Sequence, residues 1–331
     1  MNVSRKFPQS RLRRTRFTAS IRSLVAENSL SVDDLIQPIF VKEDLDGIES
    51  IDSLPGVNRH GLNALDEEIE KIQTNKIKAV AIFPVINPDK KDDQGTDSQN
   101  EDNLVCTAIK QIKKNSELAV IADVALDPYT THGHDGVLDE NGYVENDKSL
   151  SLLIKQALTL AKAGADMVAP SDMMDGRIAG IRESLESNNF ANTIILSYAA
   201  KYSSKFYGPF RDAVGSSANL GAGSKDTYQM SVSNIEEALH EVKMDIEEGA
   251  DIVMVKPGMP YLDVIKAVKD TFKIPTFAYQ VSGEYAMLKA AIENGWLSDE
   301  VLKESLLSFK RAGADCVLTY AANEIAIKLN Q

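Results

Sequence analysis

Three segments of the chain repeat one pattern, in which the end of a helical stretch is followed by Gly-Ala-Asp and then by an apolar run. The segments are AKAGADMVAP at 161–170, IEEGADIVMVK at 246–256 and KRAGADCVLTY at 310–320. A glycine in this position is typical of a helix C-terminus. A helix, a short turn and a fully apolar strand form half of a β-α-β unit, so the repetition predicts a parallel sheet covered by helices.

Apolar runs elsewhere in the chain extend this pattern to eight predicted strands. They are Leu35–Val41, Ala79–Val85, Ala119–Leu126, Met167–Pro170, Ile194–Ala200, Ile252–Val255, Thr276–Val281 and Cys316–Tyr320. Helical patterns between them include Ala64–Thr74, Leu150–Ala163, Ile235–Glu248 and Tyr261–Phe272, and Ser233 to Glu236 offers a capping box for the third of these. Eight such units predict a (β/α)8 barrel over residues 35–331, after an N-terminal arm over residues 1–34. An open doubly wound sheet is the alternative, but its glycine-rich fingerprint is missing after the first strand.

Composition limits the compartment and the partners. The net charge of −13 argues against a nucleic-acid-binding body, because phosphate would be repelled. Cys106 and Cys316 lie in apolar stretches, which predicts free thiols in a reducing compartment rather than a disulfide scaffold. The chain has no apolar run of about 18 residues and no secretion signal near Met1. We therefore expect a cytoplasmic protein without a membrane partner.

The N-terminal arm has the opposite charge to the rest of the chain. Its basic residues are Arg5, Lys6, Arg11, Arg13, Arg14, Arg16 and Arg22, and no acidic residue precedes Glu27. Three interpretations compete: a nucleic-acid-binding arm, an organelle transit peptide, or an arm that docks on an acidic neighbouring subunit. We favour docking, because the remainder of the chain supplies the complementary negative charge.

Two lysines stand at the ends of predicted buried strands. Lys256 follows the apolar run Ile252–Val255, and Lys201 follows Ile194–Ala200. A buried ammonium is costly, and one escape is a lowered pKa that leaves a neutral, nucleophilic amine. The alternative is a lysine that extends to solvent at the end of its strand. In a barrel both tips would share one mouth, where like charges disfavour double protonation, so we expect a Schiff-base enzyme acting on a carbonyl substrate.

Other reactive residues follow the same strand ends. They are Asp123, Asp127, Ser171, Asp172, Ser282 and Tyr320. The long segment between Tyr202 and Asn234 carries Arg211 and Lys225, and it is either a lid whose cations hold a substrate carboxylate or a solvated loop. The turn from Asp127 to Asp135 contains two histidines and is either a metal site or a hydrogen-bonded turn.

Several motifs in the same order closely resemble the porphobilinogen synthase family, also called 5-aminolevulinate dehydratase. They are RLRRTR at 11–16, DVALDPYTTHGHDG at 123–136, APSDMMDGR at 169–177, YAAKY at 198–202, YGPFRDA at 207–213 and MVKPG at 254–258. The resemblance implies a (β/α)8 fold and the condensation of two 5-aminolevulinate molecules to porphobilinogen in tetrapyrrole (heme) biosynthesis. It also implies a homo-octamer in which the arm wraps a neighbouring subunit.

The resemblance assigns roles to individual residues. Lys201 and Lys256 match the two Schiff-base lysines, one for each substrate molecule. Arg211, Lys225 and Gln229 fall where the family binds one carboxylate, Ser282 and Tyr320 match the hydroxyl pair for the other, and Asp123 and Ser171 line the site near the reacting amine. Many members have arginine in place of Lys225, but a single ammonium can still hold a carboxylate.

The metal implied by the resemblance is magnesium. Zinc-type members carry cysteines where this chain has Ala125, Asp127 and Asp135, so we expect no catalytic zinc, and no organic cofactor is implied. In magnesium-responsive members a glutamate at the position of Glu241 holds Mg²⁺ through water at a subunit contact, as an allosteric ion. A class I aldolase using one Schiff-base lysine, and a non-catalytic assembly protein using the basic arm, are the alternatives.

Overall fold

The protein was analysed as a computed structural model, which describes residues 6–214 and 224–331. Arg5 of the predicted arm and residues 215–223 of the predicted lid lie outside the described residues. The strands are β1 (Leu35–Lys42), β2 (Ile48–Ser50), β3 (Asn58–His60), β4 (Ala79–Val85), β5 (Ala119–Val124), β6 (Met167–Pro170), β7 (Ile194–Lys201), β8 (Ile252–Lys256), β9 (Thr276–Gln280) and β10 (Cys316–Thr319).

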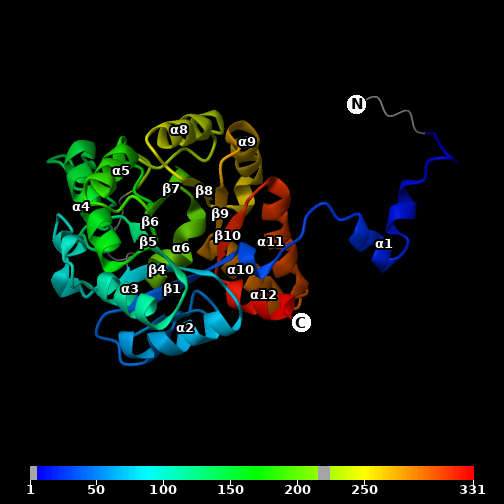
Figure 1. Cartoon of the computed structure of the whole chain (residues 1–331), viewed down its shortest axis with the longest axis horizontal. Coiled ribbons are helices and arrows are strands. Elements are labelled where there is room, and N and C mark those ends of the chain that lie inside the picture. Colours follow the sequence, from blue (N-terminus) through cyan, green and yellow to red (C-terminus); the bar gives the residue numbers. More distant parts are fainter. Residues whose placement is uncertain (1–5, 215–223) are drawn as a thin grey trace.

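Eight parallel strands close into the predicted barrel (Figure 1). From β4 to β10 each strand pairs with the next, and β1 pairs with both β4 and β10, which removes the sheet edges. Most residues of these strands are buried, as expected for a parallel sheet covered by helices. All eight predicted strands are confirmed, and the prediction of a (β/α)8 fold is correct.

Helices surround the barrel (Figure 1). They are α2 (Leu65–Thr74), α3 (Leu104–Asn115), α4 (Asn146–Ala163), α5 (Arg177–Ser187), α6 (Gly208–Ala213), α8 (Glu236–Glu247), α9 (Leu262–Phe272), α10 (Ser282–Glu293), α11 (Glu300–Ala312) and α12 (Ala322–Leu329). The predicted capping box at Ser233 is wrong: Ile235 occupies the N-cap of α8, so Ser233 lies too early to cap its first turn. Within the described ranges, no helix is long and apolar enough to cross a membrane.

The Gly-Ala-Asp repeats tie neighbouring strands together at the N-terminal end of the barrel. Gly164, Gly249 and Gly313 have φ of +104°, +109° and +114°, which only glycine adopts readily where the helix turns into the strand. The aspartate that follows each glycine accepts a hydrogen bond from a backbone N–H in the first two residues of the preceding strand. The pairs are Asp166 with Val120 N (2.8 Å), Asp251 with Ile195 N (2.8 Å) and Asp315 with Thr276 N (2.7 Å). The repeat therefore stabilises the end of the barrel away from the predicted site.

The segment between Tyr202 and Asn234 is more structured than predicted for a lid. Its described part contains α6 and a short 3₁₀ turn at Lys205–Tyr207. A second unpredicted feature is the β2–β3 hairpin between β1 and α2, which pairs with the end of β1. These strands are only three residues long and mostly polar, so they lack the apolar pattern of the barrel strands.

The N-terminal arm extends away from the barrel (Figure 1). It contains a 3₁₀ helix at Leu12–Arg16 and α1 (Ala19–Leu24), and neither has a buried residue. The arm joins the barrel just before β1, where Asp34 forms an ion pair with Lys310 (2.8 Å).

Candidate active site

The two strand-end lysines lie side by side at the barrel mouth. Lys201 ends β7, Lys256 ends β8, and the two are register partners in the parallel sheet. Neighbouring strands are about 4.8 Å apart, and paired residues of parallel strands point to the same face. Both lysines are buried, and both line two small adjoining cavities of about 40 and 30 Å³. The structure thus brings the two amines into one site, as the sequence predicts.

Aromatic rings surround the amine of Lys256. Its Nζ lies 4.9 Å from the ring centre of Tyr279, 5.0 Å from Tyr198, 5.3 Å from Phe210 and 5.4 Å from Tyr207. Burial, followed by the positive charge of Lys201, lowers the pKa of Lys256 to about 7. A substantial fraction of this amine is therefore neutral near pH 7 and can act as a nucleophile. The sequence analysis predicted both causes, and desolvation is the larger of the two.

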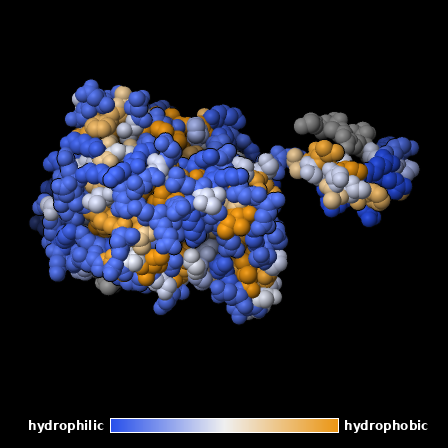
Figure 2. Space-filling model, turned by 60° about the horizontal axis from the view of Figure 1, so that its bottom comes forward, coloured by the Kyte–Doolittle hydropathy of each residue, from blue (hydrophilic) through white to orange (hydrophobic). Residues whose placement is uncertain are grey.

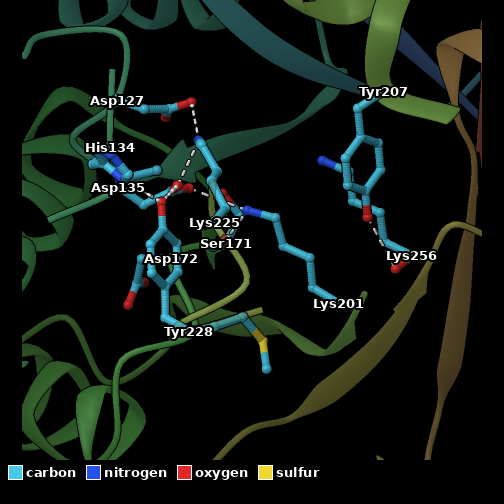
Figure 3. A network of polar contacts seen from close by, with 12 residues as sticks. Asp127, His134, Asp135, Ser171, Asp172, Lys201, Tyr207, Lys225, Tyr228 and Lys256 are labelled. Carbon is cyan, nitrogen blue, oxygen red and sulfur yellow. Dashed lines mark hydrogen bonds and ion pairs between the residues drawn. The ribbon is translucent and has the colours of Figure 1, made fainter. Parts of the chain in front are cut away.

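Lys201 belongs to a chain of alternating charges. Its Nζ donates to the carbonyl of Ser171 and pairs with Asp135 Oδ1 (3.1 Å). Asp135 Oδ2 in turn pairs with Lys225 Nζ (2.5 Å), which also contacts Asp127 Oδ2 (3.1 Å). Figure 3 shows this network on one side of Lys201, and Lys256 with Tyr207 on the other. The two amines thus have different environments, one apolar and one ionic.

The ionic network keeps Asp135 charged although the carboxylate is buried. Burial acts to raise its pKa, but Lys201 and Lys225 hold the pKa of Asp135 well below its usual range, and Tyr228 donates a further hydrogen bond (2.8 Å). For Lys225, burial acts to lower the pKa, while Asp127 and Asp135 raise it. Lys225 was predicted to hold a substrate carboxylate. Its ammonium has three donors, and the described contacts to Asp127 and Asp135 use two of them.

Asp127 and Asp135 therefore contact an ammonium rather than each other. The nearby histidines are part of a hydrogen-bonded turn, in which His134 Nδ1 lies 3.2 Å from the Tyr228 hydroxyl and His132 Nε2 lies 3.2 Å from the carbonyl of Asp93. Among the residues that the structure describes, no group of three or more His, Cys, Asp or Glu side chains is arranged to hold a metal ion.

Asp123 and Ser171 line the cavity shared by the two lysines, as predicted. Burial raises the pKa of Asp123 to about 7, although the charges of Lys256 and Lys201 oppose this. Asp123 Oδ1 has no hydrogen-bond partner within the described part of the chain. A carboxyl group with this pKa beside a neutral amine can both accept and donate a proton near pH 7.

The predicted carboxylate-binding residues fall into two places. Arg211, Lys225 and Gln229 line the larger cavity together with both lysines. Gln229 is buried, and its Oε1 finds no partner among the described atoms, which leaves this acceptor available to a donor group of a ligand. The structure confirms that these three side chains meet at the mouth.

Ser282 and Tyr320 contact Phe210 and Tyr279, two of the residues whose rings surround the amine of Lys256. Ser282 Oγ accepts a hydrogen bond from Phe210 N (2.8 Å), and the Tyr320 hydroxyl lies 2.8 Å from that of Tyr279. Neither residue lines the two cavities that contain the lysines. Both are hydrogen-bonded to residues whose rings contact the amine of Lys256.

Glu241 lies away from the mouth, on α8. Burial raises its pKa to about 6, with the charges of Asp245 and Asp175 acting in the same direction and Arg177 opposing them. A partly buried carboxylate among other acids would be stabilised by a cation. Mg²⁺ retains several waters and is commonly held by one or two carboxylates, so this single side chain fits a hydrated ion.

Some residues of the site were not identified from the sequence. Tyr207 and Phe210 lie within the motif at 207–213, but only Arg211 was selected there, because an apolar neighbour carries no obvious chemistry. Tyr228 gave a weaker signal: it is three residues from Lys225 and contacts the same carboxylate, Asp135.

A closed parallel barrel with two buried lysines at the C-terminal ends of its strands defines a barrel enzyme, because active sites of this fold lie at that end. The delta-aminolevulinic acid dehydratase family profile matches residues 9–328. The chain is 53% identical to a delta-aminolevulinic acid dehydratase of Bradyrhizobium diazoefficiens (96% of this chain, 90% of the relative) and 52% identical to one of Methanothermus sociabilis (97% and 98%). The chain belongs to the delta-aminolevulinic acid dehydratase (porphobilinogen synthase) family.

A solved relative has the same fold throughout. The crystal structure of the delta-aminolevulinic acid dehydratase from Toxoplasma gondii ME49, in complex with the reaction product porphobilinogen, superposes with a TM-score of 0.95 at 48% identity and covers 97% of this chain and 91% of its own. Family membership excludes the two alternatives, which were a class I aldolase and a non-catalytic assembly protein.

Proposed function

We propose that the barrel mouth condenses two molecules of 5-aminolevulinate to porphobilinogen through imines on Lys201 and Lys256, as a step of tetrapyrrole biosynthesis. Family membership supports the overall reaction. The observation that carries the two-lysine mechanism is the register pairing of Lys201 with Lys256 above two shared cavities. We place the reaction in the cytoplasm, since a reducing compartment agrees with the free thiols of Cys106 and Cys316.

The different surroundings of the amines suggest a division of labour. Lys256, with its lowered pKa, attacks one ketone directly, whereas the amine of Lys201 is held beside the carboxylate of Asp135. Each ketone oxygen leaves as water when the imine forms. The imine then accepts electrons as a neighbouring carbon loses a proton and bonds to the other substrate. The lysine on the carbon that received the new C–C bond leaves by elimination. Attack of one substrate amine on the remaining imine carbon closes the ring and displaces the other lysine, so both return as free amines and two waters are lost overall.

Charged and polar groups around the mouth provide substrate orientation. We assign one carboxylate to Arg211, Lys225 and Gln229 in the larger cavity, and the other to Ser282 and Tyr320 behind the aromatic residues. Among the carboxylates, Asp123 has the largest electrostatic effect on Lys256, and Ser171 lines the same cavity. We therefore assign Asp123 as the proton acceptor. No organic cofactor is required by this scheme.

The decisive experiment is incubation of the purified chain with 5-aminolevulinate and Mg²⁺, followed by colour development with Ehrlich reagent. We expect porphobilinogen to accumulate. Borohydride added during turnover should leave substrate-derived mass adducts on Lys201 and Lys256. Failure to form the pyrrole would refute the reaction, and pyrrole formation without adducts on either lysine would refute the imine mechanism.

The pH dependence should follow the protonation of Lys256. Because the neutral amine is the nucleophile and its pKa is about 7, kcat/KM should fall as the pH drops through that value and level off above it. The negative charge of Asp123 raises the pKa of Lys256, so Asp123→Asn should move this acidic limb to lower pH as well as reduce the rate. A profile of kcat/KM that is flat from about pH 6 to 9 would contradict this assignment.

We further propose that the arm joins copies of the chain into a homo-octamer. Unburied apolar residues gather on the arm in Figure 2, and Phe17 and Leu24 are 84% and 85% exposed. Arg11, Arg13, Arg14 and Arg16 are also exposed there, which suits an acidic partner surface. An arm of this kind gains stability only by packing on another chain.

Glu241 would hold Mg²⁺ in this assembly, where the ion would offset local negative charge and act allosterically rather than at the reacting carbons. We expect Glu241→Gln to abolish the response of activity to added Mg²⁺, with light scattering showing a lower mass than the wild-type octamer. Glu247→Gln, an exposed position on the same helix, is the matched control. An unchanged magnesium response in Glu241→Gln would exclude this residue as the ligand.

A further inference from the structure

Glu284 is a fully buried carboxylate that the reaction scheme does not use. It lies in the first turn of α10 and is 0% exposed. Its Oε2 accepts hydrogen bonds from Val281 N (2.6 Å) and Gly258 N (3.4 Å), and its Oε1 accepts one from Met259 N (2.5 Å). A carboxylate is normally placed in a protein interior only where strong partners compensate for its desolvation.

Only one of these three bonds belongs to ordinary helix capping. The bond from Val281 N closes the first turn of α10, as a glutamate at this position commonly does. The other two reach across to the turn that follows β8, two and three residues after Lys256. Burial raises the pKa of Glu284 to about 8, and the three amide donors act in the opposite direction. Glu284 therefore connects α10 with the turn after β8. Helix capping alone does not require the burial that raises its pKa.

The same turn packs too closely to tolerate displacement. A Cβ at Gly258 would lie 2.3 Å from the Phe309 ring and 3.0 Å from the carbonyl oxygen of Tyr279. Tyr279 provides the ring nearest to Lys256 Nζ. A shift of this turn would therefore disturb both the backbone of Lys256 and one of the rings that desolvate its amine.

The start of α10 also holds the segment that carries Arg211. Ser282 Oγ accepts from Phe210 N, and a Cβ at Gly283 would lie 2.5 Å from the carbonyl oxygen of Phe206. The first turn of α10 thus touches the Lys256 turn through Glu284 and the Arg211 segment through its two preceding residues.

We propose that Glu284 is a positioning residue that fixes the Gly258–Met259 turn on α10 and thereby sets the orientation of Lys256 for imine formation. This inference rests on the proposed role of Lys256. Glutamine has the size of glutamate, but its NH₂ group faces amide donors instead of accepting from them, so the turn loses at least one bond. Small displacements of a reacting group reduce the rate far more than they weaken substrate binding.

The test is the variant Glu284→Gln, analysed by kinetics and by borohydride trapping. We expect kcat to fall about 10–100-fold with KM changed by less than about threefold. The rate of adduct formation at Lys256 should fall in parallel, while adduct formation at Lys201 is retained. Glu284→Asp keeps the carboxyl group with a shorter reach, so it should recover part of kcat. Glu293→Gln, an exposed position on the same helix, is the matched control and should behave as wild type.

Each outcome has a distinct meaning. Wild-type kcat and wild-type trapping at Lys256 in Glu284→Gln would overturn the inference, and so would equal losses at both lysines together with a lower melting temperature, which indicate helix capping alone. If Glu284→Gln does not fold, Glu284→Asp must show the selective loss at Lys256, and its absence there also overturns the inference. Absence of any adduct in the wild type would instead refute the proposed role of the lysines.

Discussion

Lys256→Ala should abolish porphobilinogen formation, with a loss of about 10⁴-fold or more in kcat. The substitution removes an amine that is partly neutral near pH 7, and the adjacent Lys201 is needed for the other substrate molecule in the proposed scheme. Lys201→Ala should be equally inactive, because each lysine binds a different substrate molecule in the proposed scheme. Pyrrole formation in the Ehrlich assay measures both losses.

Controls separate this chemical effect from a structural one. Lys256→Ala should retain the circular dichroism spectrum and the assembly mass of the wild type. Alanine fits at a strand end, and the substitution removes an amine that is costly to bury. Lys266→Ala, at an exposed lysine on α9 that pairs with the exposed Asp270, should keep full activity. Turnover within about tenfold of wild type in either Lys201→Ala or Lys256→Ala would show that one imine suffices, as in an aldolase.

The barrel was predictable because its signals are local. The apolar runs at 79–85 and 194–200 are buried on both faces, and glycines such as Gly164 stand where the helix must turn with positive φ. The strand-end position of Lys201 and Lys256 follows from the same runs. Once the eight strands close in order, a shared mouth is a geometric consequence.

The contacts made by individual polar side chains were not predictable, because they join residues distant in sequence. Lys225 meets Asp127 and Asp135 across 98 and 90 residues, and no local pattern shows that its ammonium is already paired. The same holds for Glu284. Its spacing from Val281 indicates a helix start, but its hydrogen bonds to the turn after Lys256 join residues that only the fold brings together. Side-chain periodicity determines which face is buried, not which partner lies across it.

Arg177→Met should be the most destabilising single substitution among the charged residues, at about 3–5 kcal/mol of unfolding free energy. Arg177 is 2% exposed, and its guanidinium pairs with both oxygens of Asp245 (3.1 and 3.0 Å) and donates to Ser197 Oγ (3.2 Å). Asp172 lies 3.7 Å from its Nε. Methionine would fill much of the volume but leave two buried carboxylates without a cation.

Denaturant unfolding at a fixed protein concentration measures this loss, and the choice of variants identifies its cause. Arg182→Met is the matched control on the same helix: its pair with Asp251 is partly exposed, so its loss should be only about 1 kcal/mol. Removing the buried charge as well, in Arg177→Met with Asp245→Leu, should recover part of the stability, because the penalty comes from an uncompensated carboxylate rather than from a missing attraction. If Arg177→Met were no more destabilising than Arg182→Met, this pair would contribute to the barrel no more than a surface ion pair does.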